Sequence, residues 1–288
     1  MSEKRFIKIA IGQTKPVLAA LDRNIEKHCT FINQAIDQKA DLILFPELSL
    51  TGYSLKDATF DVAMAKDDPR LNKLCDLSSK ISISCGFAEL GHRHELYNTQ
   101  LFFEGGKLLT RHRKVYLPTY GVFEEGRYFS SGNRFHAFDS RLTRMGTLIC
   151  EDIWHPSSAL ILALDGATVI LVSAAGLTRG TNIDDKPNNI KSWETLVKSI
   201  AISTRSYVIF SNRVGVEDGL VFWGGSEIVE PDGNTVAKAE YYKEQLLVAD
   251  IDMYKLKHAR LNTTLLSDEK LPVLIEEFTR LHKQNKEY

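Results

Sequence analysis

Short apolar runs alternate with segments of helical periodicity along this chain, and no other feature of the sequence limits the fold as strongly. Residues 6–11 alternate as a strand does, residues 42–45 form an apolar run of buried-strand type, and between them apolar side chains recur at steps of three and four from Leu18 to Ile36. The rhythm continues downstream, with strands predicted over 82–89, 145–149, 168–173, 207–211 and 246–251 and helices over 71–81, 157–164 and 190–204. This succession favours layered α/β packing over an all-β sandwich.

Two pairs of predicted strands are joined by short turns. Residues 98–103 and 107–112 are linked through Gly105-Gly106, and residues 222–229 and 235–239 are linked through a Pro-Asp-Gly turn. Because a hairpin joins antiparallel neighbours, a purely parallel sheet is disfavoured. The rhythm of strands and helices alone still leaves a doubly wound sheet open as an alternative.

The chain reads as one unit. No repeat, low-complexity tract or linker divides its 288 residues, so we predict one domain over 1–288 with a C-terminal extension from about residue 252. Lys and Arg number 36 and Asp and Glu 37, which leaves no basic field for binding nucleic acid or an anionic membrane. No apolar run approaches the roughly 18 residues that span a bilayer, and residues 1–10 lack the features of a signal peptide. The sequence therefore predicts a cytoplasmic protein without nucleic-acid or membrane partners.

The four cysteines are best judged one by one. Cys29, Cys75, Cys85 and Cys150 lie far apart and form no CxxC pair, which suits neither a disulfide scaffold nor a zinc ribbon. The first three fall on or beside apolar helix faces or within a strand, and we predict that they pack in the core.

Motifs for metals and nucleotides are missing from the sequence. His92 and His94 are two residues apart, but neither HExxH nor Pro-Cys-x-x-Cys is present, so they are interpreted as loop histidines. GxxxxGK[ST] and GxGxxG are also missing. The sequence predicts no metal and no cofactor.

Cys150 is the first candidate for chemistry. It ends an apolar strand in Leu148-Ile149-Cys150-Glu151-Asp152-Ile153-Trp154, where a thiol can face a pocket and the following backbone amides can face a developing oxyanion. The plain alternative is a buried structural cysteine. Glu151 and Asp152 are costly to bury without partners, so their position directly after the strand favours a polar cleft.

Glu47 and Lys114 are the second and third candidates. Glu47 follows the apolar run 42–45, and a partly buried carboxylate there can take a proton from a thiol; the alternative is a carboxylate that only caps backbone amides. Lys114 belongs to the basic run 111–114, which as a whole suits a solvated face. If this lysine points inward, its ammonium group would lower the pKa of a nearby thiol and stabilise an oxyanion.

These segments, in the order glutamate, lysine, cysteine, resemble the nitrilase (carbon-nitrogen hydrolase) superfamily. The resemblance extends from residues 9–13 to Gly224-Gly225-Ser226 and Pro231-Asp232-Gly233. Residues 45–53 (FPELSLTGY), 116–125 (YLPTYGVFEE) and 150–154 (CEDIW) are most similar to the glutaminase domain of glutamine-dependent NAD synthetases. The resemblance implies a four-layer α-β-β-α sandwich.

The resemblance also implies an acyl-enzyme mechanism. Glu47 would be the general base, Cys150 the nucleophile that forms a thioester with a small-molecule amide, and Lys114 the cation that stabilises the tetrahedral intermediate together with the backbone N–H of residue 151. A second glutamate would orient the lysine or the substrate, and Glu125 is favoured over the adjacent Glu124. The residues expected to contact substrate are Tyr53, Tyr120, Glu151 and Trp154, whereas Trp193 and Trp223 are predicted to pack.

The sequence departs from the synthetase pattern in three places. It ends at Tyr288 without the Ser-Gly-Gly phosphate loop of a synthetase domain, which predicts no synthetase activity of its own. Ser173 and Arg179 fall out of register with the serine and arginine that hold the glutamine α-carboxylate in the glutaminases. Glu151-Asp152 also replaces the Trp-Glu of true nitrilases, which favours amides over nitriles.

Three functions remain open on this basis. The first is a free-standing amidase, the second is a glutaminase subunit that supplies ammonia to a separate synthetase, and the third is a non-catalytic scaffold. A scaffold has no reason to retain Glu47, Lys114 and Cys150 together. Members of the superfamily commonly pair through flanking helices, so the helix indicated by Leu274 and Leu281, with Phe278 between them, predicts a homodimer.

Overall fold

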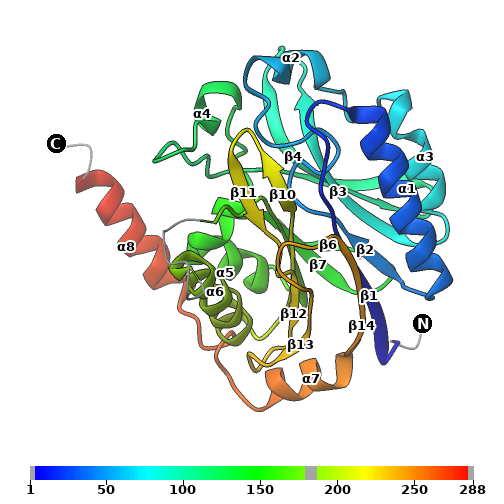
Figure 1. Ribbon diagram of the computed structural model, residues 1–288. Helices are drawn as coiled ribbons and strands as arrows, with labels where there is room; N and C mark the ends of the chain where they lie inside the picture. The colour runs from blue at the N-terminus through cyan, green and yellow to red at the C-terminus, as the bar shows by residue number, and fades with distance from the viewer. Residues whose placement is uncertain (1–3, 179–186, 285–288) are drawn as a thin grey trace.

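The computed structural model describes residues 4–178 and 187–284, which form two six-stranded sheets packed face to face (Figure 1). The first sheet has the order β14, β1, β2, β3, β4, β5, formed by Gln245–Asp252, Phe6–Gln13, Leu42–Leu44, Ser82–Leu90, Leu96–Glu104 and Lys107–Arg113. The second has the order β13, β12, β9, β8, β7, β6, formed by Thr235–Lys238, Glu227–Val229, Tyr207–Asn212, Val169–Ala174, Arg144–Ile149 and Phe138–Asp139.

Each sheet is parallel at its centre and antiparallel at its edges. Strands β1, β2 and β3 pair in parallel, as do β7, β8 and β9, while β14, β4, β5, β6, β12 and β13 pair antiparallel with their neighbours. The predicted 98–112 hairpin is formed by β4 and β5. The alternative of a single doubly wound sheet is therefore wrong.

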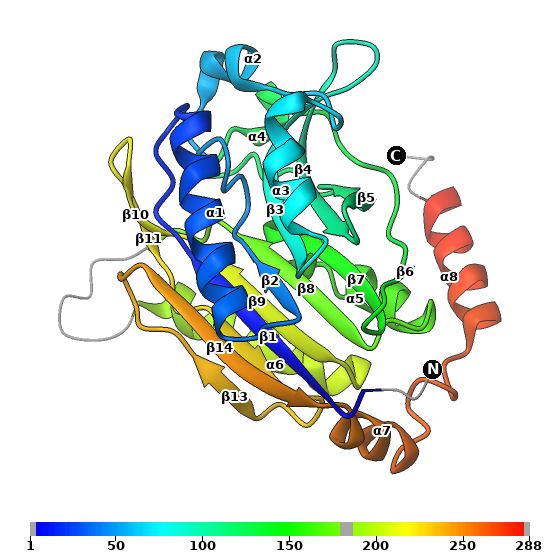
Figure 2. The ribbon, with the colours of Figure 1, turned by 90° about the vertical axis from the view of Figure 1, so that its right-hand side faces the viewer.

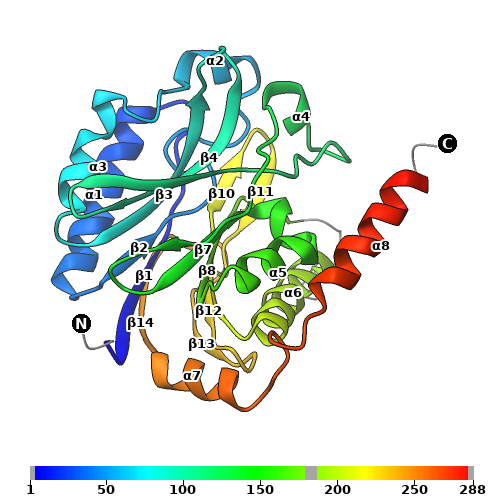
Figure 3. The same ribbon diagram turned by 180° about the vertical axis from the view of Figure 1, so that it is seen from behind.

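Helices cover the outer face of each sheet and complete four layers. Figure 2 shows α1 (Leu21–Asp37) and α3 (Asn72–Leu77) lying over the first sheet, and Figure 3 shows α5 (Pro156–Leu164) and α6 (Asn188–Thr204) on the far side of the second. The predicted helix over 71–81 is shorter than expected, because α3 ends at Leu77 and the chain enters β3 five residues later. Two further helices near the C-terminus are α7 (Met253–Leu261) and α8 (Leu271–Gln284). The short helical turns are η1 (Lys56–Ala58), α2 (Thr59–Val62), η2 (Pro69–Leu71), α4 (Glu125–Tyr128) and η3 (Cys150–Trp154).

Side-chain alternation in the strands builds two kinds of core. In β1, Ile7 and Ile9 are fully buried between the sheets, where they belong to the same cluster as Val169 and Leu171 of the second sheet. Ala10 faces the other way and packs under α1. Burial of each such isoleucine stabilises the fold by about 1.5–3 kcal/mol. The face of β1 that carries them therefore packs against the partner sheet, as the alternation predicted for residues 6–11 requires.

The predicted strand over 222–229 is instead two strands in different sheets. Gly224 and Gly225 adopt positive φ values of 71° and 60°, which break the extended run between β11 (Leu220–Trp223) and β12. A Cβ atom at Gly224 would lie 2.4 Å from a methyl group of Val214, so the turn requires glycine there. Strand β11 pairs with β10 (Val214–Glu217), which the sequence pattern did not indicate, in a separate two-stranded ribbon.

The last helix leaves the body of the molecule. Helix α8 contains no buried residue and extends away from α5 and α6 in Figures 1 and 3. The helix therefore does not fold back on the core of its own chain. Across residues 4–178 and 187–284, no helix combines the length and the apolar character needed to cross a bilayer.

Candidate active site

Glu47 is fully buried just beyond the end of β2, and both of its carboxylate oxygens are occupied. Oε1 accepts hydrogen bonds from Lys114 Nζ and Asn98 Nδ2, each at 2.7 Å, and Oε2 accepts one from the backbone amide of Ala175 at 2.8 Å. The carboxylate does bind a backbone amide, as the plain interpretation expected, but it also pairs with the lysine of the third segment. Asn98 and Ala175 were not singled out from the sequence.

Lys114 follows β5 and is fully buried between two carboxylates. Its Nζ lies 2.7 Å from Glu47 Oε1 and 2.7 Å from Glu125 Oε1. Burial alone would lower the pKa of this ammonium group, but the charges of Glu125, Glu47 and Cys150 raise it well above its ordinary value. The lysine is therefore a fixed positive charge, not a member of a solvated face.

Glu125 is the glutamate that meets the lysine. It begins α4, and its Oε1 accepts hydrogen bonds from Lys114 Nζ and from the Tyr53 hydroxyl at 2.6 Å. Burial raises its pKa to about 7, with Lys114 opposing the shift and Glu47 adding to it. Its other oxygen, Oε2, has no hydrogen-bond partner among the described residues. The adjacent Glu124 is exposed and does not contact the lysine.

Cys150 comes to this cluster from the opposite sheet. It follows β7 directly, begins η3 and adopts a φ of 46°, a strained value that turns the chain sharply at the thiol. Burial and the charge of Glu47 raise its pKa well above the ordinary value, and the opposing effect of Lys114 is smaller. The expected influence of the lysine on the thiol pKa is present but is outweighed by burial and by the charge of Glu47.

Asp152 does not face a cleft, contrary to the sequence-based expectation. It is fully buried, and its Oδ1 accepts the backbone amides of Val115 and Tyr116, each at 3.0 Å. Its Oδ2 accepts the amide of Ile149 at 3.0 Å and lies 2.8 Å from His112 Nε2. These partners compensate its burial. Asp152 thereby ties the lysine-bearing segment to the turn that carries the cysteine.

A small cavity opens on Cys150. It has a volume of about 170 Å³ and is lined by Tyr120, Phe123, Cys150, Glu151, Trp154, Gly176, Leu177, Asn189 and Trp193. We call it the acyl cavity. The hydroxyl of Tyr120 donates to Glu151 at 3.1 Å, and the rings of Trp154 and Trp193 meet edge to face with centroids 5.1 Å apart. Trp193, predicted to serve only packing, therefore also lines the cavity.

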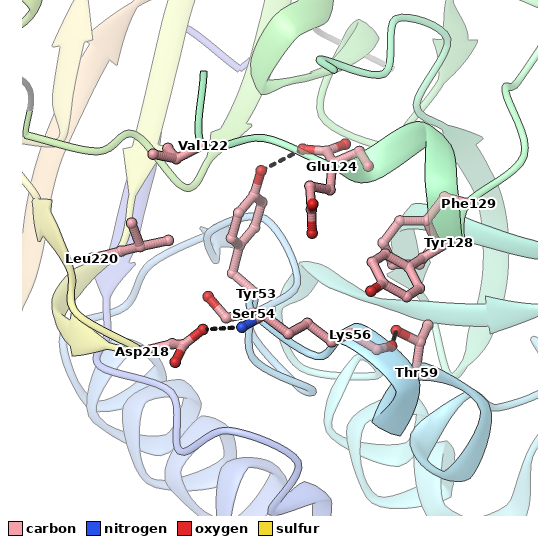
Figure 4. A pocket seen from close by; sticks show the side chains of 11 residues that line it. Tyr53, Ser54, Lys56, Thr59, Val122, Glu124, Tyr128, Phe129, Asp218 and Leu220 are labelled. Atoms are coloured by element: carbon pink, nitrogen blue, oxygen red, sulfur yellow. Dashed lines mark hydrogen bonds and ion pairs between the residues drawn. The ribbon is translucent and has the colours of Figure 1, made fainter. Parts of the chain in front are cut away.

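Tyr53 lies on a second cavity, which has no lining residue in common with the first. This cavity has a volume of about 260 Å³ and is lined by Tyr53, Ser54, Lys56, Thr59, Val122, Glu124, Glu125, Tyr128, Phe129, Asp218 and Leu220. We call it the outer cavity. In Figure 4 the Tyr53 ring stands between Val122 and Leu220 on one side and Tyr128 and Phe129 on the other.

A buried ion pair holds Tyr53 in place. Glu217 Oε1 accepts the backbone amides of Tyr53 at 2.8 Å and Ser54 at 2.7 Å, and its Oε2 lies 2.9 Å from Arg213 NH2. Arg213 is fully buried with its guanidinium over the Phe222 ring at 4.0 Å. The sequence analysis missed this pair. The signal was available, because Arg213 follows a buried strand just as Glu47 and Cys150 do.

Two further expectations concern Ser173, near the end of β8, and Arg179, which follows that strand. The Ser173 hydroxyl is buried and donates to the carbonyl of Phe45 at 3.0 Å, which leaves it in the core between the sheets. Arg179 lies outside the described residues. Within the part of the chain that the structure describes, no group of three or more His, Cys, Asp or Glu side chains is arranged to hold a metal ion.

Comparison with known proteins places this chain in a family. The sequence model of the family described as Carbon-nitrogen hydrolase matches residues 8–261. The chain belongs to the carbon-nitrogen hydrolase family. The predicted family and the predicted four-layer fold are both confirmed, since a solved carbon-nitrogen hydrolase from Helicobacter pylori superposes with a TM-score of 0.81 at 25% identity, covering 93% of this chain and 96% of that one.

Two curated relatives of different kinds are similar to this carbon-nitrogen hydrolase. A glutamine-dependent NAD(+) synthetase of Acinetobacter baylyi is 32% identical over 267 residues, which cover 90% of this chain and 46% of the relative. A nitrilase of Pyrococcus abyssi is 29% identical over 264 residues, which cover 89% of this chain and 94% of the relative. The chain thus spans about half the length of the synthetases that it matches.

Proposed function

We propose that this carbon-nitrogen hydrolase cleaves the amide bond of a small molecule through a thioester on Cys150. The observation that carries the proposal is the meeting of Glu47, Lys114 and Glu125 in one buried cluster whose charges all act on the Cys150 thiol. Buried, mutually paired groups beside a nucleophile are the arrangement that covalent catalysis requires.

The reaction follows from the positions of these groups. Glu47 removes the thiol proton as Cys150 Sγ attacks the amide carbonyl carbon, and the carbonyl oxygen takes up the negative charge beside Lys114 and the backbone N–H of Glu151. The intermediate collapses with cleavage of the C–N bond, and the leaving nitrogen receives the proton from Glu47. Glu47 then deprotonates a water molecule that hydrolyses the thioester and frees the acid.

Glu125 has a supporting role in this scheme. Together with Glu47 it holds the Lys114 ammonium from two sides, so the charge stays where the oxyanion forms. The Tyr53 hydroxyl, which donates to the same Glu125 oxygen, fixes the carboxylate in turn. Preorganised charge of this kind avoids reorganisation during the reaction.

The acyl cavity favours a small acyl group that carries an ammonium. The titratable residues among its described lining residues are the nucleophile Cys150, Glu151, and Tyr120, whose hydroxyl donates to Glu151. Two tryptophan rings complete a wall that suits a cation. No cation lines the described part of this cavity, which supports a free-standing amidase over an enzyme that must hold the α-carboxylate of glutamine.

A glutaminase subunit is the second candidate, and the 32% identity to 46% of a glutamine-dependent NAD(+) synthetase favours it. In that case glutamine hydrolysis should rise when a separate synthetase is added. The non-catalytic scaffold is the weakest candidate, because burying three paired charges is costly and serves packing no better than apolar residues would.

A panel of matched substrates tests the proposal. We expect turnover of 3-aminopropanamide to exceed that of the neutral butanamide by about tenfold in kcat/KM, and succinamate to be the slowest, because one charge-assisted contact to Glu151 is worth about 1.4 kcal/mol or more. Ammonia release is measured, with glutamine and butyronitrile included. Glu151→Gln should remove the difference between the cationic and neutral amides. Preference for the nitrile or for succinamate would contradict the proposal.

We also propose a homodimer that uses α8. The helix places Leu271, Leu274, Ile275, Phe278 and Leu281 at helical spacing, all at least partly exposed. We expect the double variant Ile275→Glu with Phe278→Glu to be monomeric by sedimentation analysis at concentrations where the native protein is dimeric. Glu276→Gln, on the same helix, serves as the control and should leave the dimer intact. A native protein that sediments as a monomer would refute the proposal.

A further inference from the structure

A third cavity lies beside β5, the edge strand of the first sheet, and shares no lining residue with the acyl cavity or the outer cavity. It has a volume of about 300 Å³, and its lining includes Tyr97, Arg111, Arg113, Ser131, Asn133 and Arg134. We call it the arginine cavity. Two histidines complete the basic side chains of its lining, and none of its described lining residues is Asp or Glu. This cavity is not part of the proposed amide-hydrolysing site.

The pleat of β5 brings two of these arginines to one face. Arg111 and Arg113 are two residues apart in the strand, so both point to the same face of the first sheet. Arg111 is in register with Leu101 of β4, which packs in one cluster with residues of α1 and α3. His112, between the two arginines, faces the other way, toward Asp152. The two guanidinium groups therefore lie on the helix-covered side of the sheet, at its β5 edge.

A single buried carboxylate serves both arginines. Glu89 accepts hydrogen bonds from Arg113 Nε at 2.9 Å and NH2 at 2.8 Å, and it also pairs with Arg111. Two arginines against one carboxylate leave one positive charge over. Arg134 adds another, because its exposed side chain forms no ion pair among the described residues. The charge of Glu95 also reaches Arg113, but the sum around the cavity stays positive.

Several N–H groups of the paired arginines are left for a ligand. Arg113 contacts Glu89 through Nε and NH2 but not NH1, and Arg111 does so through NH1 but neither Nε nor NH2. These unused nitrogens are not enclosed by protein atoms, so a small ligand can reach them. The Arg113 guanidinium also lies over the Tyr97 ring at 3.6 Å, which restricts its orientation. A guanidinium held in this way loses little freedom when it binds an anion.

The wall that carries Arg134 is fixed to the end of β5. The backbone amide of Gly132 donates to the carbonyl of Lys114 at 2.7 Å. A Cβ atom at Gly132 would lie 2.2 Å from the carbonyl oxygen of Arg113, so the segment approaches the strand as closely as only glycine allows. The two walls of the arginine cavity are therefore held together before any ligand binds, and binding does not have to order them.

We propose that the arginine cavity binds a small phosphate monoester. A monoester carries a charge of about −1.5 to −2 at pH 7 and three strong acceptor oxygens, which suit the surplus charge and the forked donors of the arginines. A carboxylate would compensate less of this charge. The volume of about 300 Å³ is at the lower limit of small-molecule pockets, so the organic part of the ligand is small. The chain as a whole, with 36 basic and 37 acidic residues, offers no wider positive field to a nucleic acid.

Calorimetric titration of ethyl phosphate into the full chain tests the site. The titration is made at pH 8, where the monoester is a dianion, and at an ionic strength of about 0.15 M, where weak surface attraction is screened. Diethyl phosphate and butanoate are the matched monoanions. We expect one site per chain with a Kd for ethyl phosphate below about 1 mM, and binding at least tenfold weaker for either monoanion.

Three variants locate the binding. Arg134→Gln removes an exposed arginine that has no ion pair in the described chain, and it should weaken binding of ethyl phosphate at least tenfold. Arg111→Lys keeps the charge beside Glu89 but loses the forked donors, so it should weaken binding at least threefold. Arg23→Gln removes the same charge from an exposed arginine of α1 outside the cavity lining, and it should keep the Kd within twofold.

Several results would overturn the site. One is the lack of saturable binding of ethyl phosphate up to about 10 mM, and another is binding that Arg134→Gln leaves unchanged. Equal affinity for diethyl phosphate would show that the cavity does not recognise the dianion. Binding of decathymidylate without binding of ethyl phosphate would assign the arginines to nucleic acid instead. Arg134→Gln should retain the circular dichroism of the native chain, so that its loss of binding is not a loss of fold.

Discussion

Cys150→Ala should reduce amide hydrolysis by about 10⁴-fold or more, to the limit of detection. The sulfur is the only atom in the cluster that can form the proposed acyl intermediate, and neither Glu47 nor Lys114 can replace it. Ammonia release from the amide panel is the measurement. Glu47→Gln should lose nearly as much activity, because the Cys150 thiol has a raised pKa and depends on the neighbouring carboxylate to become nucleophilic.

The matched control for this experiment is Cys75→Ala. Cys75 is a half-buried cysteine against the core under the first sheet, remote from the cluster, and its replacement should leave turnover within twofold. Full activity in Cys150→Ala would show that another group is the nucleophile. An intact Cys150→Ala protein that retains the circular dichroism of the native chain excludes misfolding as the cause of the loss.

Lys114→Met should abolish activity and also destabilise the fold. The methionine fills much of the same space, but Glu47 and Glu125 lose their buried counter-charge. Removing one partner of a buried ion pair costs about 3–5 kcal/mol in the free energy of unfolding. Urea unfolding at pH 8 measures the loss. Lys56→Met removes a lysine from the exposed pair with Asp218 and should cost no more than about 1 kcal/mol.

The stability deficit of Lys114→Met should shrink at low pH. Burial raises the pKa of Glu125 from 4.5 to about 7, and the loss of the lysine removes the charge that opposes this shift. A carboxyl group whose folded pKa lies above its unfolded value contributes stability below the unfolded pKa and loses it as pH rises through the folded pKa. The deficit should therefore be smaller at pH 5.5 than at pH 8. An equal deficit at both values would show that lost packing, not unpaired charge, is the cause.

The strand ends were the part of the site that sequence reasoning could find. Glu47 and Cys150 each follow an apolar run, and a polar side chain at such a position needs a partner or a cleft. Lys114 was a candidate only as one member of the basic run 111–114. The same reasoning failed for Asp152. Its burial is compensated by backbone amides of the lysine-bearing segment, and no local pattern reveals a partner that comes from another strand of another sheet.

Contacts between distant segments also limited the prediction of cavities. Helical spacing placed Trp193 on the buried face of its helix, and that is where it lies, but the spacing cannot distinguish a core from the wall of a cavity. The break at Gly224-Gly225 has a similar origin. The segment 222–229 is extended on both sides of the two glycines, and only the positions of β10 and β9 decide that its halves join different sheets.

The residues of the cluster come from both sheets of the sandwich, and this determines when the cluster is assembled during folding. Glu47 and Lys114 are carried by the first sheet, and Cys150 is carried by the second. Either sheet can gain its own hydrogen bonds without bringing these groups together. Such long-range docking forms late in folding because the chain between the sheets must first lose its freedom. Enzymatic activity, more than secondary-structure content, is therefore the measure of whether a refolded sample has assembled its two sheets.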